Sequence, residues 1–550
     1  MRKLAFFVLL LFIFSPLWAM PPMPGSGLTH DGSIREVDEC PSAFLSPALS
    51  SDEMMTRSAK TPVSVSSTGN KKVLVILAQF PDLPFNYGTS AGTKVHNNPS
   101  YYSDLLQGGS GFTMKQYYLD QSRNKLNLSF EFLGPYTTDL NYAEYGSNNS
   151  LGNDSNAYTL AKEMLNKAAA ALAPPEPSHG LDGCTVIIVH SGPGEEAGKN
   201  NPPLYAAAAD CIWSHRDKLS KHSISPITVN GTVYDSYLIV PEYNYFKGSF
   251  EATIGVFCHE FGHVIGLPDA YDTSYATTGV GQWSLMGGGS WGSIGRAGVP
   301  SGSDPAPFMA WERLALGWIS EEEIELESGS TKTISFSNIN SSDKVYSVKL
   351  TDNQYLLFEG KAKNDTGSGM YVMESGLMIT QIHKGILDSD YWTRNMINYG
   401  SYKPHGAMVV EAKAANYKEN GLGNLWRSPT PDSNRFTKEA LFRGDTLTSV
   451  SPAANVATAS GFLIAILAAW YRGRKKLCAV LTAIAFVTLI FTGCVISSES
   501  GGGGTYDTGP NTNYYTSMTN VHSKTGLSGI TVYNIRCNED GSGSFTIKKD

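Results

Sequence analysis

The sequence predicts an α+β protein in which a twisted sheet with one motif-bearing helix is followed by a β-rich, sandwich-like domain. Two observations carry this prediction. Before Trp318, short apolar runs typical of buried strands alternate with helical periodicity, whereas after it short alternating runs are separated by turn residues. The 550 residues, 41% of them hydrophobic, are enough for about two to four domains.

The chain begins with the features of a secretory signal peptide. Two basic residues precede an apolar run over 4–14, and a helix break with a small residue for cleavage follows at 15–19. We therefore expect residues 1–19 to be removed during export, with an uncleaved anchor helix as the alternative. Residues 20–69 are poor in aromatic residues and are expected to form a pro-segment.

Residues 70–320 are expected to form a catalytic domain built from strands and helices. "KKVLVILAQF" and "CTVIIVH" read as buried strands, because they are short apolar runs rich in branched residues. Helical periodicity over 155–177 ends at two prolines, and Asn230-Gly231 marks the turn of a hairpin. A second helix is expected from about Phe250 to Ile265.

Residues 321–455 are expected to form the β-rich domain. Its predicted strands are "KTISFSNI", "KVYSVKL", "QYLLFEGK", "GLMITQI" and "GAMVVEAK". Residues 497–516 read as a flexible linker, and 517–550 as strands that complete this domain.

Residues 456–496 differ from their surroundings, because two apolar runs flank a basic group at 472–476. They are expected to attach the protein to a membrane, either as a transmembrane hairpin or through a lipobox-like signal at Cys494. A foreign insertion and a buried core hairpin are the alternatives. The net charge of −8 and the lack of another long basic run argue against nucleic acid as a partner.

The stretch "HEFGH" carries the chemistry. His259 and His263 are four residues apart, so on a helix they share one face and can bind one zinc ion. Glu260 lies around the helix from His259, where it can hold the zinc-bound water and act as general base.

The third metal ligand is expected just beyond the helix. Gly266 can adopt the left-handed conformation of a sharp turn, which would bring Asp269 to the metal. Asp272 is the other candidate, and the sequence leaves both open. An Asp ligand neutralises one positive charge of the zinc ion, whereas a third neutral histidine would neutralise none. The metal then acidifies its bound water less, so more of the deprotonation of that water falls on Glu260.

This region resembles the metzincin pattern, in which a methionine turn lies beneath the metal, and Met286 in "QWSLMGGGSW" fits that role. "HEFGHVIGLPDAYDT", "GVGQWSLMGGGSW" and "PAPFMAWERLALGWI" together resemble the immune inhibitor A family of secreted bacterial metallopeptidases. The likeness covers roughly residues 70–450. It implies a metzincin-like zincin fold, zinc, often calcium, protein substrates and a latency-conferring pro-segment.

The sequence therefore predicts an exported zinc endopeptidase, secreted or held at the cell surface. A catalytically inactive zincin-scaffold surface binding protein is the alternative, and an intramembrane protease is disfavoured because the motif lies far from the apolar runs.

Weaker signals remain near the motif. Glu195 and Glu196 are expected in a solvated loop, with a calcium site as the second reading. Residues weighed for roles in or near the cleft are His190, His215, Tyr271, Cys40 and Cys258.

Overall fold

A computed structural model describes much of the chain. The described residues are 18–20, 66–86, 96–109, 111–148, 154–172, 185–196, 210–229, 231–243, 252–274, 277, 279–292, 299–364, 369–400, 405–410, 441–442 and 530–549. Most of the expected signal peptide and pro-segment, the apolar segment 456–496 and the linker 497–516 lie outside them. Within the described residues, no helix is both long and apolar enough to cross a membrane.

A six-stranded sheet organises the N-terminal half, which we define as residues 66–319 together with the strand β1. Its strand order is β1-β5-β8-β4-β2-β3, with parallel pairing from β8 through β3 and antiparallel pairing of β5 with β8 and of β1 with β5. The strands are β1 (Trp18–Ala19), β2 (Gly69–Gln79), β3 (Leu126–Thr137), β4 (Val186–Pro193), β5 (His215–Lys218) and β8 (Ser236–Tyr243). A separate hairpin joins β6 (Ile227–Val229) to β7 (Thr232–Tyr234), as predicted.

Helices cover both faces of this sheet, which explains why its central strands are continuous apolar runs. Leu160 and Met164 of the first long helix pack with Ile188 on one face, whereas Phe257 packs with Val189 on the other. The helices of this half are α2 (Pro99–Leu106), α3 (Met114–Gln121), α4 (Tyr142–Gly146), α5 (Ala157–Ala171), α6 (Ile254–Val264) and α7 (Ala310–Ala315). The two long predicted helices correspond to α5 and α6.

The β-rich half, residues 320–549, contains two sheets. A five-stranded sheet has the order β14-β13-β12-β11-β9, and a three-stranded sheet has the order β10-β16-β15. Their strands are β9 (Ser320–Glu323), β10 (Thr331–Phe336), β11 (Lys344–Thr351), β12 (Gln354–Lys361), β13 (Gly376–His383), β14 (Ala407–Val410), β15 (Ile530–Cys537) and β16 (Gly543–Lys549). The five strands predicted after Trp318 are all present. The short helices α8 (Lys384–Leu387) and α9 (Asp390–Thr393) follow β13.

The C-terminal strands join this half through β16, which pairs antiparallel with β10. In this register Gly543 is opposite Phe336, and Lys548 is opposite Thr331. Phe358 of the five-stranded sheet stacks on Phe545 of β16, with ring centroids 4.6 Å apart. The two sheets therefore contact one another through aromatic side chains.

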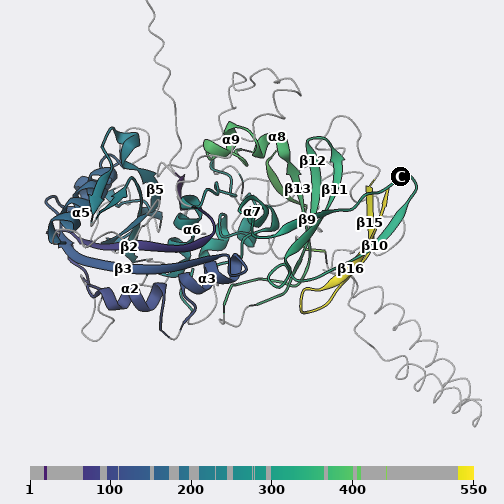
Figure 1. The fold of residues 1–550 in the computed structure, drawn as a ribbon, viewed down its shortest axis with the longest axis horizontal. Coiled ribbons are helices and arrows are strands. Elements are labelled where there is room, and N and C mark those ends of the chain that lie inside the picture. The colour runs from purple at the N-terminus through teal and green to yellow at the C-terminus, as the bar shows by residue number, and fades with distance from the viewer. Residues whose placement is uncertain are drawn as a thin grey trace, which may run out of the picture.

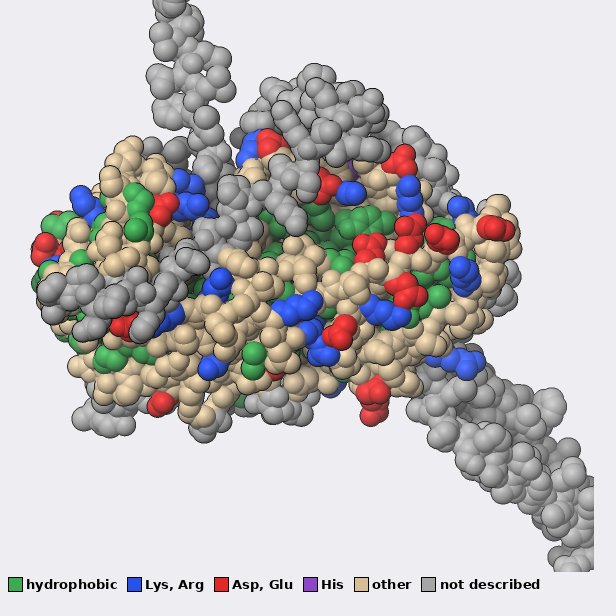
Figure 2. All heavy atoms as spheres, viewed as in Figure 1, with side chains coloured by type: hydrophobic (Ala, Val, Ile, Leu, Met, Phe, Trp, Pro, Cys, Tyr) green, Lys and Arg blue, Asp and Glu red, His purple; other side chains and the backbone are tan. Residues whose placement is uncertain are grey.

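One of the two hydrophobic clusters extends through both halves, whereas the other lies within the N-terminal half. A single cluster of buried side chains includes Phe257 of α6, Trp311 of α7 and Leu357 of β12. In Figure 1, α6 and α7 lie between the six-stranded sheet and the β-rich half, and α9 lies above them. On the face drawn in Figure 2, Lys and Arg side chains are interspersed with Asp and Glu side chains.

Candidate metal centre

The helix α6 carries the predicted motif in a fully buried setting. His259, Glu260 and His263 each have an exposed fraction of 1% or less. The helix ends in a Schellman motif, because the Leu267 amide donates to the Gly262 carbonyl at 3.0 Å and the Gly266 amide to the His263 carbonyl at 3.1 Å. Gly266 has φ 105°, a conformation that favours glycine, and it turns the chain back toward the histidines.

Three side chains converge at this turn. Nε2 of His259 and Nε2 of His263 lie 3.1 and 3.3 Å from Oδ1 of Asp269. Ligands placed 2.0–2.1 Å from a tetrahedral zinc ion are about 3.3 Å apart. Within the described part of the chain, this is the one group of three or more His, Cys, Asp or Glu residues with metal-binding spacing. The donor set and its spacing therefore fit a zinc ion.

The Nδ1 atom of each histidine forms a hydrogen bond that orients the imidazole ring. Nδ1 of His259 lies 2.8 Å from the Leu285 carbonyl, and Nδ1 of His263 lies 2.8 Å from the Leu267 carbonyl. A carbonyl accepts from N–H, so each Nδ1 carries the proton and each Nε2 presents a lone pair to a metal. Burial lowers the pKa of His263, which favours the neutral form that binds metals.

The carboxyl groups differ in their charge state. Burial alone would raise the pKa of Asp269, but the two imidazoles beside it lower this pKa to about 2. The pKa of Glu260 is raised well above its usual value by burial and then by the negative charges of Asp269 and Glu196. Neither carboxyl oxygen of Glu260 has a hydrogen-bond partner among the described residues. Such an environment makes Glu260 a strong proton acceptor once a nearby cation offsets the negative charge.

Met286, the residue expected in a methionine turn, packs against the helix at Gly262. It is fully buried, and a Cβ atom added to Gly262 would come within 2.4 Å of its sulfur. Its carbonyl accepts from the Ala270 amide at 2.7 Å. The segment 285–286 therefore contacts both the first histidine and the loop that carries Asp269.

The structure separates the two candidate carboxylates. Asp269 lies with the histidines, whereas Asp272 accepts five hydrogen bonds, from the amide and hydroxyl of Ser274, the amide and hydroxyl of Thr277, and the Gly400 amide. Asp272 thus holds its loop together, and it does not belong to the converging group.

The edge of the main sheet passes beside the site. β1 pairs antiparallel with β5, so that Ala19 faces His215. The Met20 amide donates to the Ser214 carbonyl at 3.1 Å, and the Trp213 indole donates to the Met20 carbonyl at 3.0 Å. The Met20 side chain is fully buried, and its backbone lies close enough to Glu260 to act on the pKa of that carboxyl. The N-terminal segment 18–20 therefore lies at the site.

The remaining candidates have mainly structural surroundings. Burial lowers the pKa of His190 to about 4, and its Nδ1 donates to the Ser191 carbonyl. His215 is also buried, and its Nδ1 donates to the Trp213 carbonyl at 2.7 Å. Tyr271 stacks beside His259 with ring centroids 6.5 Å apart. Cys258 is buried within α6, and Cys40 lies outside the described residues.

One expectation about this region was wrong. Glu195 and Glu196 do not lie in a solvated loop, because each is only 1% exposed. Burial raises the pKa of both carboxyls, that of Glu195 to about 8, and Asp154 nearby is affected in the same way. The sequence could not indicate this burial, since the local pattern of glycine and charge is typical of an exposed turn.

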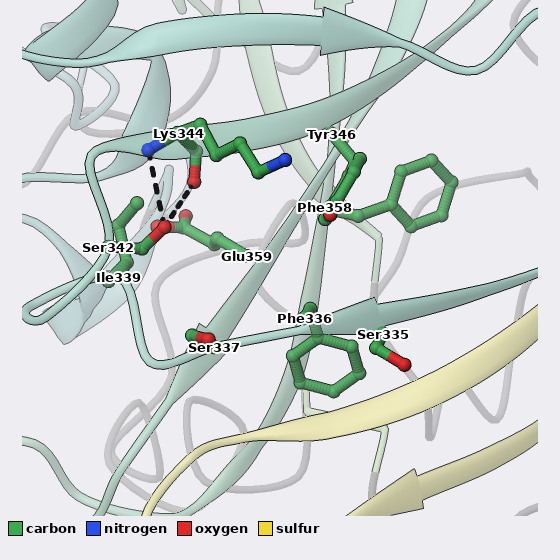
Figure 3. Close-up of a pocket in the computed structure, with 9 residues that line it drawn as sticks. All are labelled: Ser335, Phe336, Ser337, Ile339, Ser342, Lys344, Tyr346, Phe358 and Glu359. Atoms are coloured by element: carbon green, nitrogen blue, oxygen red, sulfur yellow. Dashed lines mark hydrogen bonds between the residues drawn. The ribbon is translucent and has the colours of Figure 1, made fainter.

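A small pocket in the β-rich half lies between β10, β11 and β12. It is lined by Ser335, Phe336, Ser337, Ile339, Ser342, Lys344, Tyr346, Phe358 and Glu359. Figure 3 shows the hydrogen bonds between Ser342 and Lys344 at its rim. None of the converging metal-site residues belongs to it.

One residue that contacts the site directly carries no mark in the sequence. Asn395, which follows α9, forms two hydrogen bonds with Asp269 across 126 positions of sequence. No local pattern marks such a partner, and only the fold brings it to the site.

Two kinds of relative match part of this chain. The pre-pro-metalloprotease PrtV of Vibrio cholerae serotype O1 is 32% identical over 302 residues, which cover 46% of this chain and 31% of the relative. Immune inhibitor A of Bacillus thuringiensis subsp. alesti is 27% identical over 282 residues, covering 43% of this chain and 38% of that protein. The chain thus spans about a third of the length of these curated relatives.

The family expected from the motifs is confirmed. The model of the immune inhibitor A peptidase M6 catalytic domain matches residues 59–182 and 173–319 of this chain.

Proposed function

We propose that the chain is an exported zinc-dependent endopeptidase that hydrolyses peptide bonds in proteins. The observation that carries this proposal is the convergence of His259, His263 and Asp269 at tetrahedral zinc spacing, with the buried carboxyl of Glu260 on the same helix. The family match and the metalloprotease relatives support protein substrates. Met286 beneath the helix supports a metzincin-like zincin fold, and the Phe358–Phe545 contact supports a sandwich-like second domain.

The chemistry divides between the metal and this chain's own residues. A zinc ion bound by the three ligands would polarise the scissile carbonyl and make water more acidic. Glu260 takes the proton of the attacking water and later delivers it to the leaving amine. The neutral histidines remain oriented throughout by their Nδ1 hydrogen bonds to Leu285 and Leu267. Tyr271, beside His259, is proposed to donate a hydrogen bond to the developing oxyanion.

We also propose a secreted or cell-surface bacterial zymogen. Residues 1–19 would direct export, residues 20–69 would act as the pro-segment, and 456–496 would provide any membrane or lipid attachment. Latency is supported by Met20, the first residue of the proposed pro-segment, which is buried against the site beside Glu260 and whose amide donates to the Ser214 carbonyl. An extended segment at this position would obstruct a substrate that bound there as an additional strand.

Calcium is proposed as a second ion. Glu195 Oε2 and Asp154 Oδ1 are buried without a hydrogen-bond partner among the described residues, and the nearby Glu196 adds further negative charge. Carboxylate and amide oxygens are the ligands that Ca²⁺ prefers. Nδ2 of Asn148 donates to Oε1 of Glu195 at 2.9 Å, and Oδ1 of Asn148 is buried without a hydrogen-bond partner among the described residues.

The alternative function is an inactive zincin scaffold that binds other proteins at the cell surface. Elemental analysis and casein cleavage distinguish the two. The proposal expects about one zinc per chain and casein hydrolysis that phenanthroline abolishes and added zinc restores. Stable zinc content without hydrolysis by the activated chain would favour the scaffold, and absence of zinc from folded protein would contradict the proposed site.

A further inference from the structure

The loop that carries Asp269 is held from the β-rich half. We define the metal loop as residues 266–273 and the bracket segment as residues 392–400, which runs from α9 toward β14. The family match ends at residue 319, so the bracket segment lies outside it. In Figure 1, α9 lies above α6, at the junction between the two halves.

Asn395 makes a reciprocal pair of hydrogen bonds with Asp269. The Asp269 amide donates to Oδ1 of Asn395 at 2.6 Å, and Nδ2 of Asn395 donates to Oδ2 of Asp269 at 2.5 Å. Both side chains are fully shielded from solvent, with exposed fractions of 0% for Asn395 and 1% for Asp269. One amide thus fixes both the backbone and the carboxylate of the same residue.

The pair determines which carboxylate oxygen faces the histidines. Oδ2 is occupied by Asn395, whereas Oδ1 lies 3.1 and 3.3 Å from the two Nε2 atoms. Because the amide is neutral, it orients the carboxylate without cancelling the negative charge that a cation would require.

The rest of the bracket segment supports this contact. The Trp392 indole donates to the Gly266 carbonyl at 3.0 Å, and the Thr273 hydroxyl donates to the Asn395 carbonyl at 3.1 Å. Asn398 donates to the Ala270 carbonyl at 2.8 Å and accepts from the Ala407 amide of β14 at 3.1 Å. Hydrogen bonds therefore connect the metal loop to the five-stranded sheet.

The backbone of Asn395 is adapted to its place. Its φ is 57°, in the left-handed region that Asn, Asp and Gly adopt more readily than other residues. The variants are chosen to allow this conformation. Asn395→Gly removes the side-chain amide and Asn395→Asp replaces the N–H donor by a carboxylate oxygen, and both Gly and Asp can adopt the left-handed backbone conformation.

We propose that Asn395 is a positioning residue for Asp269, and that the β-rich half thereby completes the metal site. The inference rests on the proposed zinc function. Loss of the Asn395 donor frees Oδ2 and lets the carboxylate of Asp269 rotate. Its effect on the zinc Kd should therefore exceed the effect expected from the loss of folding stability alone.

The test measures zinc affinity by chelator competition on the full chain, with Glu260→Gln present in every sample to prevent self-cleavage. Asn395→Gly is expected to raise the zinc Kd by about 10–100-fold, the usual effect of losing an outer hydrogen bond to a metal ligand. Asn395→Asp is expected to raise it at least as much, because it places a second carboxylate against Asp269. Asn398→Gly is the matched control, since Asn398 is buried in the same segment but hydrogen-bonds to the backbone of Ala270 and Ala407 and not to a proposed metal ligand.

Thermal unfolding with and without zinc provides the second readout. Asn395→Gly and Asn398→Gly are expected to lower the melting temperature of the zinc-free protein similarly, but only Asn395→Gly should shrink the zinc-induced rise. Equal zinc Kd values for the two variants, or an unchanged Kd in Asn395→Gly and Asn395→Asp, would overturn the inference. If Asn395→Gly does not fold, Asn395→Asp decides alone. Failure of the parent to bind zinc would instead contradict the proposed function.

Discussion

Nε2 of His259 lies 3.1 Å from Oδ1 of Asp269, a carboxylate brought back to the helix by the turn at Gly266. Nε2 of His263 lies 3.3 Å from the same oxygen, and both separations match the spacing of neighbouring ligands in a tetrahedral zinc site. The fourth corner is the position at which water and substrate would be expected to meet the metal.

The two aspartates of the metal loop should respond differently to amide substitution. Asp269→Asn is expected to weaken zinc binding by more than about 100-fold, because even outer-shell contacts to a metal ligand account for about 10–100-fold. Asp272→Asn should keep zinc but lower stability by about 1–3 kcal/mol, since an amide nitrogen would face N–H and O–H donors. Chelator competition and urea unfolding measure the two effects, and a zinc-binding Asp269→Asn protein would exclude Asp269 as a ligand.

Calcium binding should depend on pH through Glu195. Burial raises the pKa of this carboxyl to about 8, so between about pH 4.5 and 8 the folded state binds more protons than the unfolded state. Without calcium, stability contributed by this group therefore falls as pH rises through that window. Calcium needs the ionised carboxylate, so its stabilising effect should grow over the same window.

Melting temperatures with and without calcium, at about pH 5 and about pH 8, check this prediction. Glu195→Gln serves as the control and should remove most of the difference. A calcium effect of equal size at both pH values would argue against Glu195 as a ligand.

Close contact between α6 and the loops beneath it should make Gly255 intolerant of a side chain. A Cβ atom there would lie 2.0 Å from the Ser290 carbonyl oxygen, which is backbone and cannot rotate away. Gly255→Ala is expected to destabilise the protein by about 1–3 kcal/mol or more, as other overpacked sites do. Gly111→Ala is the matched control, because no atom lies within 4 Å of its added Cβ. Equal melting temperatures for the two variants would refute this packing.

Release of the N-terminal segment should raise activity. Met20, the first residue of the proposed pro-segment, is buried beside Glu260, and its amide donates to the Ser214 carbonyl. A specific cleavage site introduced between residues 21 and 65 would allow hydrolysis of a peptide substrate to be compared before and after cutting. The rate should rise after cutting, and a synthetic peptide that begins at Met20 should lower it again. A rate that does not change on cutting, with the segment shown to have dissociated, would contradict a role in latency.

Local patterns predicted much of the fold and most of the candidate site. Apolar runs located β2 and β4, alternation located the strands after Trp318, and the four-residue spacing placed both histidines on α6, because each signal depends on neighbours in sequence. The motif pointed to Met286 and favoured Asp269 as the third ligand. Asp272 remained the other candidate, since both carboxylates lie within reach of the turn.

What could not be predicted depends on distant contacts. Asn395 reaches Asp269 from 126 positions away. Glu195 is buried by other segments, and no sequence pattern in those segments indicates that they cover it. Trp18 and Ala19 read as the end of a cleaved leader, yet they pair with the sheet edge. Tertiary packing sets these features, and a sequence window cannot record it.

Glu260→Gln tests the central claim most directly, through zinc content and peptide hydrolysis measured on the same activated sample. The substitution keeps the shape of a side chain that points to no hydrogen-bond partner among the described residues, so the fold and the zinc content should be preserved. Removal of the proton acceptor should reduce hydrolysis by at least about 100-fold, the lower range for a general base. Hydrolysis at the parental rate by zinc-loaded Glu260→Gln protein would contradict the account.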